Sequence, residues 1–471
     1  MSWHESCGIF GIFAPEEDVA RLTFFALFAL QHRGQESSGI ATADGDNIWL
    51  HTGMGLVSHV FDEECLSRLT GTIAIGHNRY STTGSRQMMN AQPIVVESAA
   101  GKIALGHNGN IVNAQPLRQE LSEQGCTFFT STDSEVIAKL IVTSPGRTWV
   151  DRISHAMHRL EGAYSLVILT HDSLIGVRDP LGVRPLCLGG TDGCRVLASE
   201  TCALDHVGME FDREVAPGEI VVIDANGIQS FLGAQMDRHA LCVFEYIYFA
   251  RPDSTIAGRL LYWAREAMGE RLAQEYPVSA DIVIGVPDSA TVAAVSYARE
   301  SGVPFVEGLL KNRYVGRTFI EPDQRIRQLG VGLKFNPLRE IIGGKRLIVV
   351  DDSIVRGTTT PHIISLLRKA GAKEVHMRVC APPIRFPCFF GVDMATRWEL
   401  LAARKTVPQI QEFIGADSLG YLSLEGLVEA VGLPPDSLCL ACLTGDYPIP
   451  VQLEMDKLAL EALPRESMRP W

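Results

Sequence analysis

A cysteine near the start of the chain is the first residue whose chemistry points to catalysis. Cys7 precedes a short apolar segment, residues 8–12, with the sequence Gly-Ile-Phe-Gly-Ile. A thiolate is a strong nucleophile, and an α-amino group on the same residue can serve as its base. That role requires the six preceding residues to be removed, so residues 1–6 are predicted to be a propeptide. The competing interpretation is that Cys7 is a small residue buried in a strand. That interpretation would be favoured if Cys7 stood alone, without other motifs around it.

Four polar motifs follow Cys7 in the first third of the chain. Each alone is explained by local structure, because Asn-Gly favours a turn and Ser, Thr or Asp before an apolar run caps a helix. The motifs are Gln-His-Arg-Gly-Gln-Glu (31–36), His-Asn-Arg-Tyr-Ser-Thr (77–82), His-Asn-Gly-Asn (107–110) and Thr-Ser-Thr-Asp-Ser-Glu (130–135). Together with residues 178–185 they resemble the glutaminase domain of the N-terminal-nucleophile amidotransferases.

That resemblance implies a role for each of five residues. Arg79 would clamp the carboxylate of glutamine bidentately, and Asp133 would pair with its ammonium group. Attack by Cys7 on the amide carbon develops an oxyanion, which the Asn108 side chain and the Gly109 backbone N–H are suited to hold.

A predicted strand–loop–helix unit in the second half has the composition of a phosphate site. Strand 346–350 ends in Asp351-Asp352, and a loop rich in Ser, Thr and Gly leads to a helix that starts at Pro361. Loop N–H groups at a helix N-terminus bind phosphate, and paired carboxylates suit Mg²⁺ or sugar hydroxyls. The segment is neither a Walker A motif nor a dinucleotide fingerprint. The alternative is a solvated turn with an N-cap.

Residues 349–360 resemble the 5-phosphoribosyl-1-pyrophosphate (PRPP) loop of type I phosphoribosyltransferases. The resemblance implies that Asp351 and Asp352 lie at the ribose hydroxyls and Mg²⁺, while residues 353–358 wrap the 5-phosphate. A second turn, residues 285–290, looks like the pyrophosphate side of the same family, with Ser289 facing the metal. The predicted PRPP-binding residues are Asp351, Asp352, Ser353, Arg356, Gly357, Thr358 and Arg317.

Arg317 belongs to a basic segment between these two turns. Residues 311–346 contain nine basic and three acidic residues, a balance of +6 in a chain whose net charge is −13. Within it, residues 312–319 are predicted to be a mobile lid over a polyanion. A solvated surface is the alternative for any such run of charge.

The cysteines of the second half suggest a metal centre. Cys439 and Cys442 form a CxxC pair, which alone fits zinc, a redox dithiol, an iron–sulfur cluster or plain burial. The strings around Cys242 and Cys388, residues 242–254 and 385–393, resemble the cluster-bearing branch of the glutamine PRPP amidotransferases. The resemblance implies a structural 4Fe–4S cluster held by all four, although thiolates alone suit zinc as well. The remaining bystanders, predicted to be core residues, are Cys65, Cys126, Cys187, Cys194, Cys202 and Cys380.

Composition excludes several classes of protein. The 471 residues are 46% hydrophobic and 21% charged, which is ordinary globular composition. The acidic balance argues against a general nucleic-acid or membrane-surface binder. The most apolar stretch, residues 22–30, is too short to span a membrane, and no signal peptide is evident. A cytoplasmic protein is expected.

The chain is predicted to fold as two domains of mixed α/β and α+β class. Short strands separated by turns, with helices at 19–31 and 134–142, favour stacked β-sheets between helical layers up to residue 235. Beyond residue 255, strands at 281–286 and 346–350 alternate with helices at 256–275, 290–300 and 361–370, which indicates a parallel sheet flanked by helices. The predicted domains are a glutaminase domain (7–235) and a phosphoribosyltransferase domain with a C-terminal cluster-binding segment (236–471).

Taken together, the motifs resemble the amidophosphoribosyltransferase family. The resemblance implies ammonia transfer from glutamine to PRPP as the first committed step of purine synthesis, with Mg²⁺, a homo-oligomer (a tetramer) and inhibition by purine nucleotides. Two rivals remain: an amidotransferase with a sugar-phosphate or asparagine-type acceptor, and a silent regulator that senses PRPP. The loop 349–360 argues against the first, and the complete set of catalytic residue types argues against the second.

Overall fold

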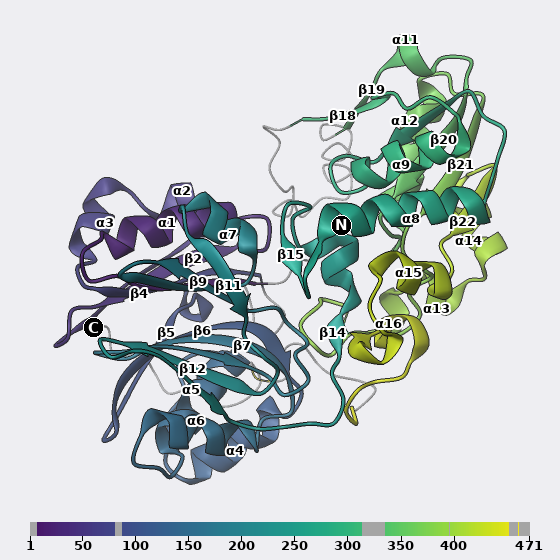
Figure 1. The fold of residues 1–471 in the computed structure, drawn as a ribbon. Helices are drawn as coiled ribbons and strands as arrows, with labels where there is room; N and C mark the ends of the chain where they lie inside the picture. Colours follow the sequence, from purple (N-terminus) through teal and green to yellow (C-terminus); the bar gives the residue numbers. More distant parts are fainter. Residues whose placement is uncertain (1–6, 81–86, 313–334, 395, 452–459, 461–471) are drawn as a thin grey trace.

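Two antiparallel sheets stacked face to face form the first half of the chain (Figure 1). The computed structural model describes residues 7–80, 87–312, 335–394, 396–451 and 460. The strands of the first sheet are β1 (Gly8–Phe13), β2 (Ser37–Ala43), β3 (Ile48–Met54), β4 (Ile73–Arg79), β9 (Cys187–Thr191), β10 (Cys194–Ala198) and β11 (Glu210–Glu214). Their order is β11-β9-β10-β1-β4-β2-β3, which places the strand that follows Cys7 at the centre.

The second sheet carries the other polar motifs of this half. Its strands are β5 (Ile94–Ser98), β6 (Gly101–Ile111), β7 (Gly162–Leu169), β8 (Leu174–Arg178), β12 (Glu219–Asp224) and β13 (Gly227–Leu232), in the order β13-β12-β8-β7-β6-β5. Helices cover both outer faces: α1 (Val19–Ala29), α2 (Val57–Val60), α3 (Glu63–Arg68) and α7 (Thr201–His206) on the first sheet, and α4 (Ala114–Glu123), α5 (Asp133–Thr143) and α6 (Trp149–Met157) on the second.

Alternation along the strands explains this layering. In β1, Phe10 and Ile12 pack under the helices, whereas Ile9 faces the opposite sheet and meets Val167 and Ala104 there. Successive side chains of a strand point to opposite faces, so a strand buried on both sides is apolar throughout. The predicted stacked sheets between helical layers are confirmed.

A parallel sheet forms the centre of the second half. Its strands β17 (Ile282–Gly285), β20 (Arg346–Asp351), β21 (Glu374–Val379) and β22 (Ser418–Tyr421) lie in the order β17-β20-β21-β22. Helices α8 (Leu261–Glu275), α9 (Thr291–Ser301) and α15 (Leu424–Val431) pack against one face, and α12 (Thr360–Lys369) and α14 (Val407–Ile414) against the other. The shorter elements here are β18 (Leu309–Lys311), β19 (Phe335–Pro337), α11 (Arg339–Ile342), η3 (Arg397–Glu399), α13 (Leu401–Arg404) and η4 (Pro435–Ser437).

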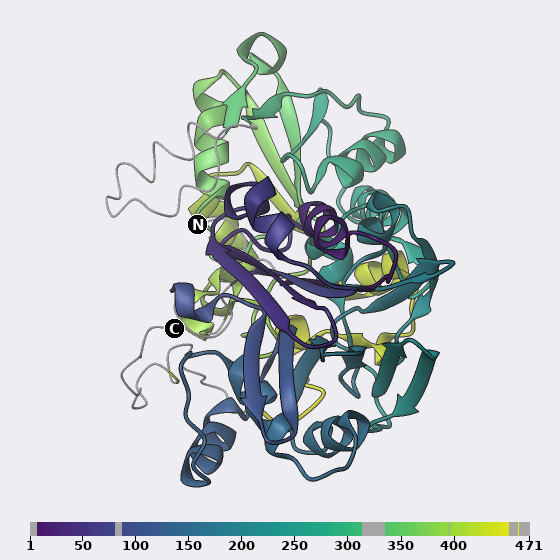
Figure 2. The same cartoon turned by 90° about the vertical axis from the view of Figure 1, so that its left-hand side faces the viewer.

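One segment joins the two halves and brings the chain end back to the junction. After β13 come β14 (Leu241–Cys242) and a π-helix, η2 (Glu245–Phe249). Near the C-terminus, β23 (Leu438–Cys439) pairs in parallel with β14, and α16 (Ala441–Thr444) follows it. The two halves lie side by side with this segment between them (Figures 1 and 2).

The structure corrects one predicted helix. The helix expected over 256–275 begins only at Leu261, because β15 (Thr255–Ile256) and β16 (Arg259–Leu260) form a hairpin before it. The turn of that hairpin has positive φ at Ala257 and Gly258 (50° and 71°), a conformation that ends helical periodicity. The other predicted helices and strands are present within a few residues of their expected ends.

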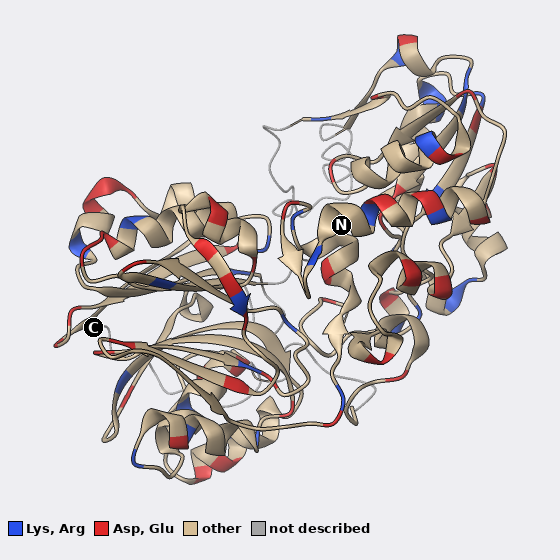
Figure 3. Cartoon of the chain, viewed as in Figure 1, with Lys and Arg blue, Asp and Glu red and all other residues tan. Residues whose placement is uncertain are grey.

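Charge is distributed over both halves of the molecule. Acidic and basic residues are interspersed on the helices and loops (Figure 3).

Across the described ranges, no helix is long and apolar enough to cross a membrane.

Candidate functional sites

Cys7 lies buried at the centre of the first half, immediately before β1. Its side chain is 5% exposed, its Sγ donates to the backbone oxygen of Tyr80 at 3.3 Å, and the Tyr80 N–H donates to Sγ at 3.4 Å. Burial raises the pKa of the thiol to about 11, although the contact with Tyr80 and the charge of Arg79 oppose the shift. Cys7 is therefore a neutral thiol near pH 7, and it needs a base in order to attack.

The charged residues predicted to bind glutamine surround this thiol. Arg79 ends β4 and Asp133 opens α5, and both side chains are buried. The charges of Arg79, Glu36 and Asp133 all act on the thiol of Cys7. Arg79 Nη1 lies 3.8 Å from Glu36 Oε2, and Asp133 Oδ2 accepts the Ile111 N–H at 3.2 Å. The fold thus brings one cationic and two anionic groups to one buried thiol.

Asn108 and Gly109 lie on β6 of the opposing sheet. Asn108 is fully buried. Gly109 has a φ of +148°, and a Cβ there would lie 2.1 Å from the carbonyl oxygen of Ala163 on β7. Only glycine fits such a position, because a side chain would push β6 away from β7.

The second half of the chain packs directly against this strand. Asn110 Nδ2 donates to the backbone oxygen of Phe389 at 2.9 Å, and a Cβ on Gly391 would lie within 3.1 Å of the Gly109 backbone. The wall of the Cys7 site is therefore built from both halves.

Arg33 lies in the polar motif 31–36 and contacts Cys7 directly, a role that the sequence did not predict for it. Arg33 Nε donates to the backbone oxygen of Cys7 at 3.0 Å, and its guanidinium is fully buried. The available signal was the position of Arg33 in a polar motif directly after the first helix.

The paired aspartates of the second half lie at the carboxyl end of β20. Asp351 and Asp352 are buried, and Asp352 accepts hydrogen bonds from the hydroxyls of Ser289 and Ser353. Burial, reinforced by the charge of Asp352, raises the pKa of Asp351 well above its usual value, and burial raises the pKa of Asp352 as well. A second turn therefore meets the carboxylate pair through Ser289, whose role at a metal stays a prediction.

A pocket opens beside these aspartates, with about 540 Å³ of empty space including the part open to solvent. Its lining includes Asp351, Phe244, Phe249 and the loop from Ser353 to Thr360. Gly357 has a φ of +68°, and a Cβ there would lie 2.5 Å from Leu401 Cδ2, so this turn of the loop requires glycine.

Of the two arginines predicted to bind PRPP, Arg356 lies within the described residues. Arg356 lines the pocket, but its guanidinium is engaged with the Glu399 carboxylate at 2.8 Å and the Asp393 carbonyl at 3.1 Å. Arg317, the predicted lid beyond residue 312 and most of the basic segment 311–346 lie outside the described residues. At the ends of that segment, Lys311 pairs with Asp288 and Arg346 with Asp281.

The four cysteines predicted to hold a cluster converge at the junction of the halves. Cys242 and Cys439 are register partners in the β14–β23 pair, and the Cys442 carbonyl accepts the N–H groups of Arg385 and Phe386, just before Cys388. Burial raises the pKa of each thiol, that of Cys242 to about 11, and the charges of the other three raise the pKa of Cys442 further. All four are free thiols.

The other cysteines largely behave as predicted. Cys380 is buried beside the aspartate pair, and Cys187, Cys194 and Cys202 are buried in the first half. The prediction that all bystanders are core residues is wrong for Cys65 and Cys126, which are partly exposed. Within the residues that the structure describes, no group of three or more His, Cys, Asp or Glu side chains is arranged to hold a metal ion.

A buried thiol between stacked sheets, joined to a parallel sheet with a phosphate-type loop, defines a class: glutamine amidotransferases fused to a phosphoribosyltransferase. Family models support both parts, since residues 77–206 match a glutamine amidotransferase domain and residues 258–383 a phosphoribosyl transferase domain. An amidophosphoribosyltransferase from Synechococcus elongatus is 50% identical over 467 residues, covering 98% of this chain and 95% of its own. One from Methanocaldococcus jannaschii is 50% identical over 466 residues, covering 95% and 98%.

Solved structures agree with these relatives. Glutamine PRPP amidotransferase from B. subtilis, complexed with ADP and GMP, matches with a TM-score of 0.89 and 46% identity over 95% of this chain and 98% of its own. The chain belongs to the amidophosphoribosyltransferase family. It is an enzyme that uses glutamine to aminate PRPP in purine biosynthesis, yielding 5-phosphoribosylamine, pyrophosphate and glutamate.

Proposed function

We propose that Cys7 is the nucleophile of the glutaminase centre, once residues 1–6 have been removed. The observation that carries the proposal is the convergence of the charges of Arg79 and Asp133 on a buried thiol. The raised pKa of that thiol makes a nearby base necessary, and the α-amine of a chain that begins at Cys7 belongs to the same residue and can act as one.

Each of the residues around Cys7 has a separate role in glutamine hydrolysis. Arg79 holds the substrate carboxylate and Asp133 its ammonium group, which places the amide carbon at Sγ. Sγ bonds to that carbon as its proton passes to the amine, and the oxyanion is held by Asn108 and the Gly109 N–H. The C–N bond then breaks, the nitrogen takes the proton and leaves as ammonia, and water hydrolyses the remaining glutamyl thioester to glutamate.

We propose that the aspartate pair and its loop form the second catalytic centre. Asp351 and Asp352 hold the ribose hydroxyls and, together with Ser289, Mg²⁺. The residue types fit the ion, because two buried carboxylates with raised pKa values would be stabilised by a divalent cation. Mg²⁺ supplies charge neutralisation at pyrophosphate.

The loop after the pair binds the 5-phosphate of PRPP through Ser353, Arg356, Gly357 and Thr358. Arg317, which lies outside the described residues, is proposed to bind PRPP as well. Ammonia attacks the ribose C1 there, the bond to pyrophosphate breaks, and one proton is released.

We propose a structural 4Fe–4S cluster on Cys242, Cys388, Cys439 and Cys442. The donor types fit, because four free thiols, three of them buried and that of Cys388 partly buried, lie near enough for the charges of three to act on Cys442, where two distant stretches of chain are paired. Metal binding to such a site adds directly to the free energy of folding, so a cluster there fastens the chain end to the second half. Anaerobically purified protein is expected to contain iron and sulfide. Active protein that contains zinc and no iron would contradict this assignment.

Two further expected properties of the enzyme are inhibition by nucleotides and assembly into an oligomer. Since the B. subtilis relative is complexed with ADP and GMP, we propose that purine nucleotides inhibit this enzyme too. A homo-oligomer, of tetramer size, is expected from the family and is tested by light scattering of the purified protein.

The two-site proposal is tested with Cys7→Ala and the control Cys126→Ala, which removes a partly exposed thiol from the same half. Cys7→Ala is expected to lose glutamine-dependent synthesis of phosphoribosylamine and to keep synthesis from added ammonia. Cys126→Ala should keep both. A Cys7→Ala enzyme that still uses glutamine would contradict the role of Cys7, and loss of both activities in a folded protein would contradict two separable centres.

A further inference from the structure

A carboxylate from the second half is buried against the arginine that holds Cys7. Glu245 opens the π-helix η2, and its side chain is 0% exposed. It accepts hydrogen bonds from Arg33 Nη1 at 3.0 Å and Nη2 at 2.9 Å, and from Arg184 Nη1 at 3.0 Å. Bidentate guanidinium–carboxylate pairs of this kind fix geometry as well as charge.

All three nitrogens of the Arg33 guanidinium donate hydrogen bonds. Its Nε donates to the Cys7 carbonyl at 3.0 Å, and its Nη1 also donates to Glu200 at 2.5 Å. Burial alone would lower the pKa of Arg33, but Glu245 and Glu200 together raise it above its usual range. A buried guanidinium needs such partners, because an uncompensated buried charge is strongly destabilising.

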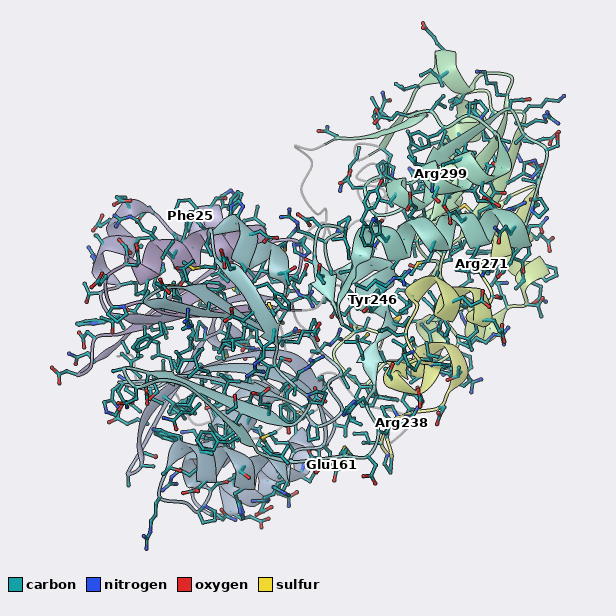
Figure 4. All side chains as sticks on the ribbon, in the orientation of Figure 1. Phe25, Glu161, Arg238, Tyr246, Arg271 and Arg299 are labelled. Carbon is teal, nitrogen blue, oxygen red and sulfur yellow. The ribbon has the colours of Figure 1, made fainter. Side chains whose placement is uncertain are left out.

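Glu245 is in turn anchored to the phosphoribosyltransferase half. Arg265 of α8 donates to the backbone oxygens of Tyr246 at 2.9 Å and Ala250 at 2.6 Å, at the two ends of η2. Tyr246 lies between the two halves in Figure 4. The backbone that carries the Glu245 carboxylate is therefore anchored in the second half, while the carboxylate itself pairs with Arg33 of the first half.

We infer that Glu245 is a positioning residue for the Cys7 nucleophile, supplied by the phosphoribosyltransferase half. The inference rests on the proposed role of Cys7. With Arg33 locked between Glu245 and Glu200, the Cys7 carbonyl is held in place, which restrains the backbone that carries the sulfur and the amine. The glutaminase centre is incomplete without the second half of the chain.

Glu245→Gln tests the inference, because it keeps the shape of the side chain and removes its charge. The matched control is Glu219→Gln, which breaks another bidentate pair in the first half, with Arg213 at 2.9 and 2.7 Å. Glu245→Gln is expected to lower kcat for glutamine by about 10- to 100-fold, the cost of a small misplacement of a reacting group. The KM for glutamine should stay near its normal value, because Arg79 and Asp133 are untouched. Synthesis from added ammonia should be retained, which shows that the protein is folded.

The outcomes separate this inference from the proposed role of Cys7. Partial rescue of kcat by Glu245→Asp, which keeps the charge, would support positioning. A normal kcat for glutamine in Glu245→Gln overturns the inference, and so does an equal loss with glutamine and with ammonia, which indicates general damage. A loss in Glu219→Gln as large as that in Glu245→Gln overturns it as well. If Cys7→Ala, assayed in parallel, still uses glutamine, the role of Cys7 fails instead.

Discussion

Removing residues 1–6 is expected to change how the Cys7 thiol responds to pH. In the chain that carries these residues, burial holds the thiol pKa at about 11. At pH 7, four units lower, only about one thiol in 10,000 is ionised. The rate of alkylation of Cys7 should then rise about tenfold for each pH unit towards that pKa. A chain that begins at Cys7 carries a free α-amine, whose ordinary pKa is about 7.7–8.0 and which can take the thiol proton. In this shorter chain, the rate of alkylation of Cys7 should level off near pH 8.

The assay compares the two chains, verified by intact mass, during reaction with iodoacetamide. Modification of the Cys7 peptide is measured by mass spectrometry over a pH range that spans both pKa values. Cys126 serves as an internal reference, because burial raises its pKa and it is far from the N-terminus in sequence. Its profile should be the same in both chains. The proposed role of the α-amine is contradicted if the alkylation rate of the longer chain already levels off near neutral pH. It is also contradicted if the two chains give the same pH profile at Cys7.

Three further predictions concern the oxyanion site, the phosphate loop and the cysteine site. Asn108→Ala should lower kcat for glutamine by about 10²–10³-fold in steady-state assays and spare ammonia-dependent synthesis, because it removes one oxyanion donor; a loss under about tenfold would count against that role. Gly357→Ala should raise the KM for PRPP roughly tenfold with either nitrogen source, because a left-handed φ costs alanine about 1–2 kcal/mol and its Cβ would meet Leu401; an unchanged KM would show that the loop does not need this turn for binding. Cys442→Ser should lose iron and sulfide in elemental analysis of anaerobically purified protein, whereas Cys126→Ser should keep both; retained iron in the first variant would remove Cys442 from the ligand set.

Local pattern predicted the elements but not their partners. Apolar alternation in residues 8–12 is enough to predict β1, because a strand buried on both faces needs apolar side chains throughout. Its place between β4 and β10 depends on pairing across long stretches of chain, which no local pattern encodes. That pairing brings Cys7 to Tyr80 and the charge of Arg79.

The same limit applies to the junction. The four cysteines could be grouped from the sequence only by resemblance, since their convergence depends on the parallel pairing of β14 with β23. The role of Glu245 could not be predicted from the neighbouring sequence. A glutamate beside aromatic residues does not indicate that two buried arginines, distant in sequence, will pair with it. The hairpin at 255–260 was missed because Ala257 adopts a positive φ, which is uncommon for a residue other than glycine.

The proposed nucleophile is tested most directly by quenching the enzyme in acid during turnover with PRPP and isotopically labelled glutamine. Peptide mass spectrometry then locates any labelled glutamyl group. The proposed role of Cys7 predicts a glutamyl adduct on Cys7 in chains that lack residues 1–6. Turnover of glutamine with the adduct on another residue, or by a chain that still carries Met1, would contradict it.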